Sequence, residues 1–133
     1  MKVYRGVEGL EGKFNSPALT LGNFDGVHIG HRKIFEKLRL KADESGGEAV
    51  IFTFDPHPVK VLRPDENHRL ITPLPEKLKL LEESGADAVI LADFTKTFAA
   101  LHPAHFVRDI IHKAIGAEFV LSLVHISEPT RPY

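Results

Sequence analysis

Two histidines, three glycines and an aspartate stand together in the ten residues GNFDGVHIGH, positions 22–31. This stretch directly follows the apolar run ALTL at 18–21, and a helical pattern begins at about Gly30. A strand that enters a glycine-rich turn before a helix leaves unpaired backbone N–H groups and the positive end of the helix dipole at the turn. Glycines also let the backbone approach a phosphate closely. The stretch therefore favours an anion site.

The two histidines, His28 and His31, are three residues apart at a predicted helix start, so both can lie on the same side of the first turn. Their ring N–H groups would donate to phosphoryl oxygens. A single histidine is usually a surface or core residue, but H-x-G-H spacing in such a turn favours a functional role. Asp25 has two nearly equal interpretations, a cap of the turn or a residue of the anion site.

The glycine spacing argues against two common phosphate motifs. The chain has no G-x-x-x-x-G-K-[ST] pattern, and its glycines are spaced G-x-x-x-G rather than G-x-G-x-x-G. The remaining chemistry is phosphoryl or nucleotidyl transfer in which histidine takes the place of a P-loop lysine. A phosphate nucleophile is already ionised at neutral pH, so no general base is needed. Catalysis would then come from positioning and charge stabilisation, usually with Mg²⁺.

Short apolar runs alternate with segments of helical period along the chain. We predict strands at 18–21, 49–54, 88–91 and 117–120 from these runs. The predicted crossover helices carry the apolar positions Ile34, Phe35, Leu38 and Ala42, then Leu74, Leu78 and Leu81, then Phe106, Ile110 and Ala114. Glycines at 85 and 116 follow the second and third helices as C-terminal caps. The sequence therefore predicts an α/β fold, a Rossmann-like open parallel sheet of four strands with three crossover helices.

Ligands of such sheets bind beyond the carboxyl ends of the strands. The segments 22–31, DPHP at 55–58 and DFTKTF at 93–98 each follow a predicted strand. We therefore expect all three to meet along one edge of the sheet.

The composition excludes several classes of protein. The 133 residues carry 17 basic and 18 acidic side chains, a formal charge of −1, so nucleic acids and anionic membranes are not expected partners. The absence of cysteine excludes disulfides, thiolate catalysis and zinc sites built on sulfur. Because no signal peptide and no apolar run near ~20 residues is present, we expect a cytoplasmic protein that does not span a membrane.

The motifs together resemble a known family. GNFDGVHIGH resembles the H-x-G-H signature of the nucleotidylyltransferase superfamily, which pantetheine-phosphate adenylyltransferases and cytidylyltransferases share. With TL before it and FTFDPHP at 52–58, which begins in the second predicted strand, it is similar to the FMN adenylyltransferase domain of bacterial bifunctional riboflavin kinase/FAD synthetases. The similarity covers roughly residues 15–120.

The resemblance implies that ATP and FMN react to give FAD and pyrophosphate, with Mg²⁺, and that His28 and His31 contact the ATP phosphates. The implied ATP-site residues besides the histidines are Gly22, Asn23, Phe24, Asp25 and Gly30. The implied residues of the flavin side are Phe54, Pro56, His57 and Pro58. No protein metal site is expected, because His102, His105 and His112 lack a carboxylate at ligand spacing and fit a solvated helix face.

The end of the chain departs from the family pattern. We expect an adenylyltransferase portion at 1–120 and a non-native tail at 121–133, because LSLVHISEPTRPY resembles the translation of a sequencing adapter. The alternative is that VLSLV continues the last strand. The family's later Ser/Thr/Arg phosphate motif and its C-terminal riboflavin kinase domain do not occur within the 133 residues. The alternative functions are a nucleotide-binding module without turnover and another H-x-G-H nucleotidylyltransferase.

Overall fold

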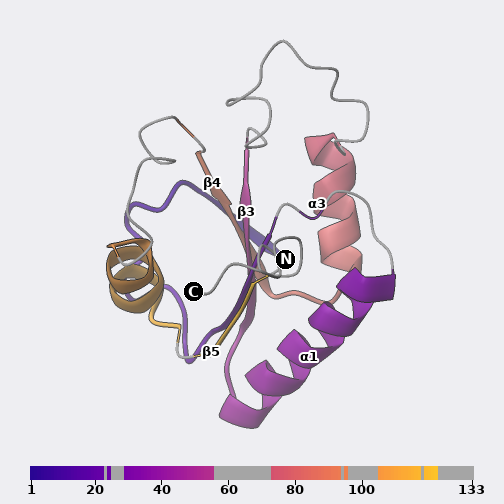
Figure 1. Ribbon diagram of the computed structural model, residues 1–133, viewed down its shortest axis with the longest axis horizontal. Coiled ribbons are helices and arrows are strands. Elements are labelled where there is room, and N and C mark those ends of the chain that lie inside the picture. The colour runs from indigo at the N-terminus through magenta and orange to yellow at the C-terminus, as the bar shows by residue number, and fades with distance from the viewer. Residues whose placement is uncertain are drawn as a thin grey trace, which may run out of the picture.

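The protein is an α/β molecule built on a parallel sheet (Figure 1). The computed structural model describes residues 1–22, 24, 29–55, 73–93, 95, 105–117 and 119–122, with the backbone alone at 29–31, 106–108 and 122. Its strands are β1 (Lys2–Arg5), β2 (Ala18–Leu21), β3 (Ala49–Phe54), β4 (Ala88–Ala92) and β5 (Phe119–Ser122). They lie in the order β1-β4-β3-β2-β5, and each neighbouring pair is parallel.

The central strands β3 and β4 are buried along nearly their whole length, as expected of parallel strands that are covered on both faces. Alternate residues enter different cores. Val50 and Phe52 pack in one core and Ile51 in the other, because successive side chains of a strand point to opposite faces.

Three helices of the described chain cover the two faces (Figure 1). They are α1 (Ile29–Ser45), α3 (Leu74–Glu83) and η1 (Phe106–Ile115). Helices α1 and α3 lie on one side of the sheet and η1 on the other. The apolar face that the sequence predicted for α1 is confirmed, since Phe35, Leu38 and Ala42 are buried in the core on that side.

The helix η1 is wider than the α-helix that the sequence predicted. It is a π-type helix, and the N–H of Gly116 donates to the carbonyl oxygen of Ile111, five residues back. Gly116 ends it in the left-handed conformation, with φ of 79°, so the predicted glycine cap is confirmed.

The number of strands and the place of the last one were predicted wrongly. The described chain has five strands, because the short edge strand β1 pairs with β4. The last strand runs over Phe119–Ser122 instead of 117–120, and its pairing with β2 brings Leu121 opposite Thr20. The strands at 18–21 and 49–54 have the predicted bounds, and β4 extends the predicted strand to Ala92.

The order of the strands reverses at β2. From β2 the chain crosses through α1 to β3 on one side, whereas β5 pairs with the other side of β2. In open parallel sheets ligands bind at such a reversal, beyond the carboxyl ends of the strands. The turn that follows β2 therefore starts at the position where this fold binds ligands.

Candidate active site at the carboxyl edge of the sheet

Gly22 is the first residue of the candidate site. It directly follows β2, is buried, and its N–H donates to the carbonyl oxygen of Phe52 at 3.1 Å. This hydrogen bond holds the beginning of the turn against the neighbouring strand β3. A backbone that is fixed in this way leaves the sheet between β3 and β5, where the strand order reverses.

The beginning of α1 supplies backbone donors to the same edge. The helix starts at Ile29, so Gly30 and His31 stand in its first turn, as the sequence predicted. The first four N–H groups of a helix have no partner within the helix. Because the first turn of α1 contains no acidic residue, no side-chain carboxylate of that turn competes with an external anion for these groups.

Phe24 has an unusual conformation within this turn. Its φ is 54°, in the left-handed region, and its side chain is only 3% exposed. The ring lies 5.4 Å from the ring of Phe35 on α1, with 34° between the two planes. The ring therefore belongs to the core, and a contact of Phe24 with ATP stays a prediction.

Several predicted residues of the ATP site fall outside the described part of the chain. These residues are Asn23, Asp25 and His28. For Gly30 and His31 the structure describes the backbone. The roles predicted for all of them stay predictions, while Gly22, Phe24 and the start of α1 are brought to the same edge.

The predicted flavin side begins at the end of β3. Phe54 is the last residue of that strand and is half-buried, and its ring packs edge-on against the ring of Phe52 with centroids 5.6 Å apart. Pro56, His57 and Pro58 lie outside the described residues. Their contact with a flavin therefore stays a prediction.

Sequence reasoning placed Asp55 at this edge but missed Arg5 and the ion pair between them. The Asp55 carboxylate lies 3.6 Å from the Arg5 guanidinium, and the Asp55 N–H donates to the carbonyl oxygen of Ala92 at 3.0 Å. Arg5 ends β1 and reaches past β4 to the end of β3. Its side chain is 69% exposed, so the ion pair contributes little to stability. Nothing in the local pattern of KVYR indicated this pair.

The described residues contain no group of three or more His, Asp or Glu side chains that could hold a metal ion. Magnesium in nucleotide sites is bound largely by substrate phosphates and one or two carboxylates. Exposed Asp93, at the end of β4, is one described carboxylate at this edge. A magnesium ion that arrives with ATP stays a prediction.

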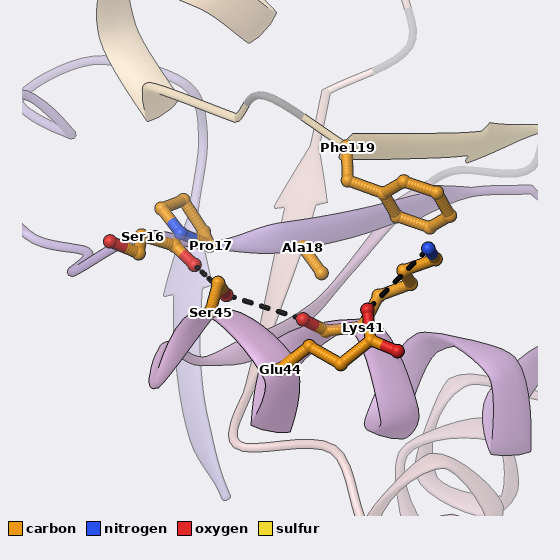
Figure 2. Close-up of a pocket in the computed structure, with 7 residues that line it drawn as sticks. All are labelled: Ser16, Pro17, Ala18, Lys41, Glu44, Ser45 and Phe119. Carbon is orange, nitrogen blue, oxygen red and sulfur yellow. Dashed lines mark hydrogen bonds and ion pairs between the residues drawn. The ribbon is translucent and has the colours of Figure 1, made fainter.

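A cavity of about 290 Å³ lies at the opposite, amino edge of the sheet (Figure 2). It is lined by Ser16, Pro17, Ala18, Lys41, Glu44, Ser45 and Phe119. The Lys41 ammonium lies 3.5 Å from the Glu44 carboxylate and 5.3 Å from the centre of the Phe119 ring. The Ser45 hydroxyl donates a hydrogen bond to the carbonyl oxygen of Ser16 at 3.3 Å. The side chains of Lys41, Glu44 and Ser45 are thus partnered within the protein, and the cavity lies at the edge opposite the candidate site.

The amino edge also holds the clearest electrostatic network. The Asp87 carboxylate accepts hydrogen bonds from the N–H of Ala49 at 2.8 Å and from the guanidinium of Arg39 at 2.9 Å. Partial burial by itself would raise the pKa of Asp87, but these two hydrogen bonds and the positive charges of Arg39 and the N-terminus together hold the pKa below its usual value. The network joins α1 to the beginnings of β3 and β4.

Comparison with known proteins identifies related chains. The family model described as FAD synthetase matches residues 11–122. The bifunctional riboflavin kinase/FMN adenylyltransferase of Escherichia coli K12 is 34% identical over 121 residues, which cover 90% of this chain and 39% of the relative. The protein of the same name from Bacillus subtilis is 36% identical over 108 residues, covering 76% of this chain and 34% of the relative.

A solved structure has the same fold. A protein named as a macrolide-efflux protein from Streptococcus pneumoniae superposes with a TM-score of 0.75 at 26% identity, over 91% of this chain and 41% of that one. This likeness supports the α/β fold with its parallel sheet. None of the helices in the described ranges is long and apolar enough to cross a membrane.

Proposed function

The chain belongs to the FAD synthetase family, and from this premise we propose that it carries the nucleotide-binding part of an FMN adenylyltransferase. The observation that carries the proposal is the turn after β2. It leaves the sheet where the strand order reverses and leads into the first turn of α1, which has no acidic residue. Backbone donors at such a position suit the triphosphate of ATP.

In the proposed reaction an oxygen of the FMN phosphate attacks the α-phosphorus of ATP. The new P–O bond forms FAD, and the bond from the α-phosphorus to the bridging oxygen breaks, so pyrophosphate leaves with that electron pair. The attacking phosphate is ionised at neutral pH, so no side chain has to remove a proton. Bound Mg²⁺ would add charge neutralisation at the phosphates.

The residues of this chain would orient the two nucleotides and stabilise the transferred phosphoryl group. The backbone N–H groups of the turn and of Gly30 and His31 are proposed to contact the phosphates, with the rings of His28 and His31 as further donors. Donors that are already fixed before reaction lower the barrier, because they need not reorganise as charge develops.

The turnover of the 133 residues alone is a separate matter. The chain spans 39% of the length of the Escherichia coli relative. This observation favours a second candidate function for the isolated chain, a nucleotide-binding module that needs further residues for catalysis. The relatives' names pair two activities, so we propose that a riboflavin kinase domain accompanies this one in the whole protein.

We also propose that the adenylyltransferase portion ends at residue 120 and that the protein is cytoplasmic. Strand β5 continues through Ser122, and its pairing with β2 uses Leu121 and Ser122. A non-native tail at 121–133 remains the proposed interpretation of the last residues, since strand pairing places few demands on side-chain identity at a sheet edge.

The test of the function uses a chimera in which the Bacillus subtilis relative supplies the sequence that follows residue 122. FAD formation from FMN and ATP with Mg²⁺ is measured for the unaltered chimera and for His28→Ala and His31→Ala. We expect each substitution to lower kcat by about 100-fold, the usual effect of removing a donor to a developing charge. His112→Ala is the matched control, because His112 is exposed on η1.

Unchanged FAD formation in both histidine variants would contradict the proposed roles. If the 133-residue chain binds ATP with Mg²⁺ in a calorimeter but the chimera forms no FAD, the binding module is the better description. If the chimera neither binds nor uses FMN, another H-x-G-H nucleotidylyltransferase becomes the better assignment.

A further inference from the structure

The side chain of Phe24 is buried although its backbone is left-handed. A left-handed φ of 54° brings the Cβ of an ordinary residue close to the carbonyl that follows it. Such a conformation persists only where the surrounding structure holds it, and it is concentrated at functional sites. Because the ring is only 3% exposed, the core beneath α1 is what holds it.

The ring joins two parts of the candidate site. It packs against Phe35, which stands in the second turn of the same α1 helix that the turn opens. On the other side, two residues earlier, Gly22 is hydrogen-bonded to the carbonyl oxygen of Phe52. Gly22 is thus tied to β3 and Phe24 is packed against α1, so the chain that leaves β2 is held at both of these residues.

We propose that Phe24 is a positioning residue for the nucleotide. Its ring binds no ligand; it fixes the left-handed turn and, through the turn, the direction of the backbone N–H groups at the start of α1. This inference rests on the proposed function, which assigns those N–H groups to the ATP phosphates. It gives the side chain of Phe24 a different role from the ATP-lining one that the family resemblance implies.

A purely structural role for the ring would have a different consequence. Leu38 lies in the same core, is 1% exposed and comes from α1, one helical turn after Phe35. Leu38→Ala and Phe24→Ala both leave a cavity in this core, but only the second removes a side chain of the turn. Leu38→Ala is therefore the matched control.

The first experiment measures the affinity of the 133-residue chain for ATP with Mg²⁺, at a temperature where each variant is folded. We expect Phe24→Ala and Phe35→Ala each to weaken binding about tenfold or more, because either one releases the turn. The double variant should bind ATP no more than about threefold more weakly than the single variant with the lower affinity, since residues in contact act as one unit. Leu38→Ala should stay within about threefold of the unaltered chain. An equal loss in Leu38→Ala would overturn the proposal.

Two further substitutions separate the ring from the backbone conformation. Phe24→Gly accepts a left-handed φ without steric cost but has no ring, so we expect it to bind ATP as weakly as Phe24→Ala. Phe24→Leu keeps a large apolar group in the core, and we expect it to recover most of the affinity. Full affinity in Phe24→Gly would contradict the proposed role of the ring.

A readout without ATP keeps the failure of this inference distinct from that of the proposed function. We expect Phe24→Ala to speed hydrogen exchange at the Gly22 amide at least about tenfold relative to amides in the middle of β3. Leu38→Ala should change both sets of amides together. Unchanged relative protection at Gly22 would overturn the proposed role of the Phe24 ring in holding the turn, even if ATP binds. Failure of the unaltered chain to bind ATP would overturn the proposed function and the nucleotide role, while exchange still decides whether the ring holds the turn.

Discussion

The two edges of the sheet are built with different chemistry. At the amino edge, side chains satisfy the backbone: the Asp87 carboxylate accepts the N–H of Ala49, and the Glu48 carboxylate accepts the N–H of Asn15 at 3.0 Å. At the carboxyl edge the first N–H groups of α1 have no partner within the helix, and the first turn of α1 has no acidic residue. A fold of parallel strands can therefore close one edge with its own charges and leave donors for a ligand at the other.

The same contrast applies to the two non-glycine residues of the described chain whose φ is positive. Ser16 at the amino edge has φ of 44°, and its carbonyl oxygen lies close to Gly47, so the strain serves a tight crossing of two chain segments. Phe24 at the carboxyl edge has φ of 54°, and its ring supports a turn that leads to the candidate site. Similar backbone strain thus has a packing role at one edge and a proposed positioning role at the other.

The largest effect on stability is expected from Gly47→Ala. An added Cβ would overlap the carbonyl oxygen of Ser16 and lie 2.7 Å from that of Asn15. Because backbone atoms cannot move aside cheaply, we expect a loss of about 3 kcal/mol in the free energy of unfolding, measured with urea. Gly46→Ala is the matched control, since Gly46 has φ of 67° but nothing near its Cβ position, and about 1 kcal/mol is expected for it. Equal losses would contradict the tight crossing.

The next effect in size is expected from Asp87→Ala. It leaves the N–H of Ala49, which is buried, without its acceptor and removes the partner of Arg39. We expect a loss of about 2 kcal/mol in the free energy of unfolding, because an unsatisfied buried donor carries a desolvation cost. The affinity for ATP should not change. A weakened affinity at equal folded fraction would show that the two edges are not independent.

The pH dependence of stability sharpens the same comparison. The pKa of Asp87 in the folded protein is lower than its ordinary value of 3.8, so its carboxylate stabilises the fold above that pH. This contribution is lost as pH falls through the folded pKa. We expect the difference in urea midpoint between the unaltered chain and Asp87→Asn to shrink below about pH 4. A difference that stays constant from pH 6 to about pH 3 would contradict the network.

The smallest effect is expected from Arg5→Ala at the carboxyl edge. The ion pair with Asp55 is 3.6 Å long and the arginine is 69% exposed, so we expect a loss below about 0.5 kcal/mol. Thermal unfolding at low and high salt checks this. A loss as large as that of Asp87→Ala would mean that side-chain charges stabilise both edges.

The sequence was sufficient for the strands whose side chains are buried on both faces. AVIFTF at 49–54 is a continuous apolar run, so its bounds as β3 could be predicted. The edge strand β1 could not be predicted, because KVYR is short and largely exposed. It forms a strand through pairing with β4, more than 80 residues away. Register with β2, rather than local composition, also places β5 two residues later than predicted.

The candidate site was predictable where local chemistry defines it. Glycines and histidines in a turn before a helix indicated a phosphate site, and the structure puts Gly22 and the start of α1 at the edge where this fold binds ligands. The burial of Phe24 depends on Phe35, which packs against it only after α1 has docked. Likewise, Arg39 and Asp87 are 48 residues apart and carry no local signal of their pairing.

The most direct test is a titration of the 133-residue chain with ATP and Mg²⁺, followed by the chemical shifts of its backbone amides. We predict that the largest changes fall on Gly22, Gly30 and His31, and that the amides of Ser45 and Gly47 at the amino edge do not move. Changes centred on the amino-edge cavity, or no changes at any amide, would contradict a nucleotide site at the carboxyl edge.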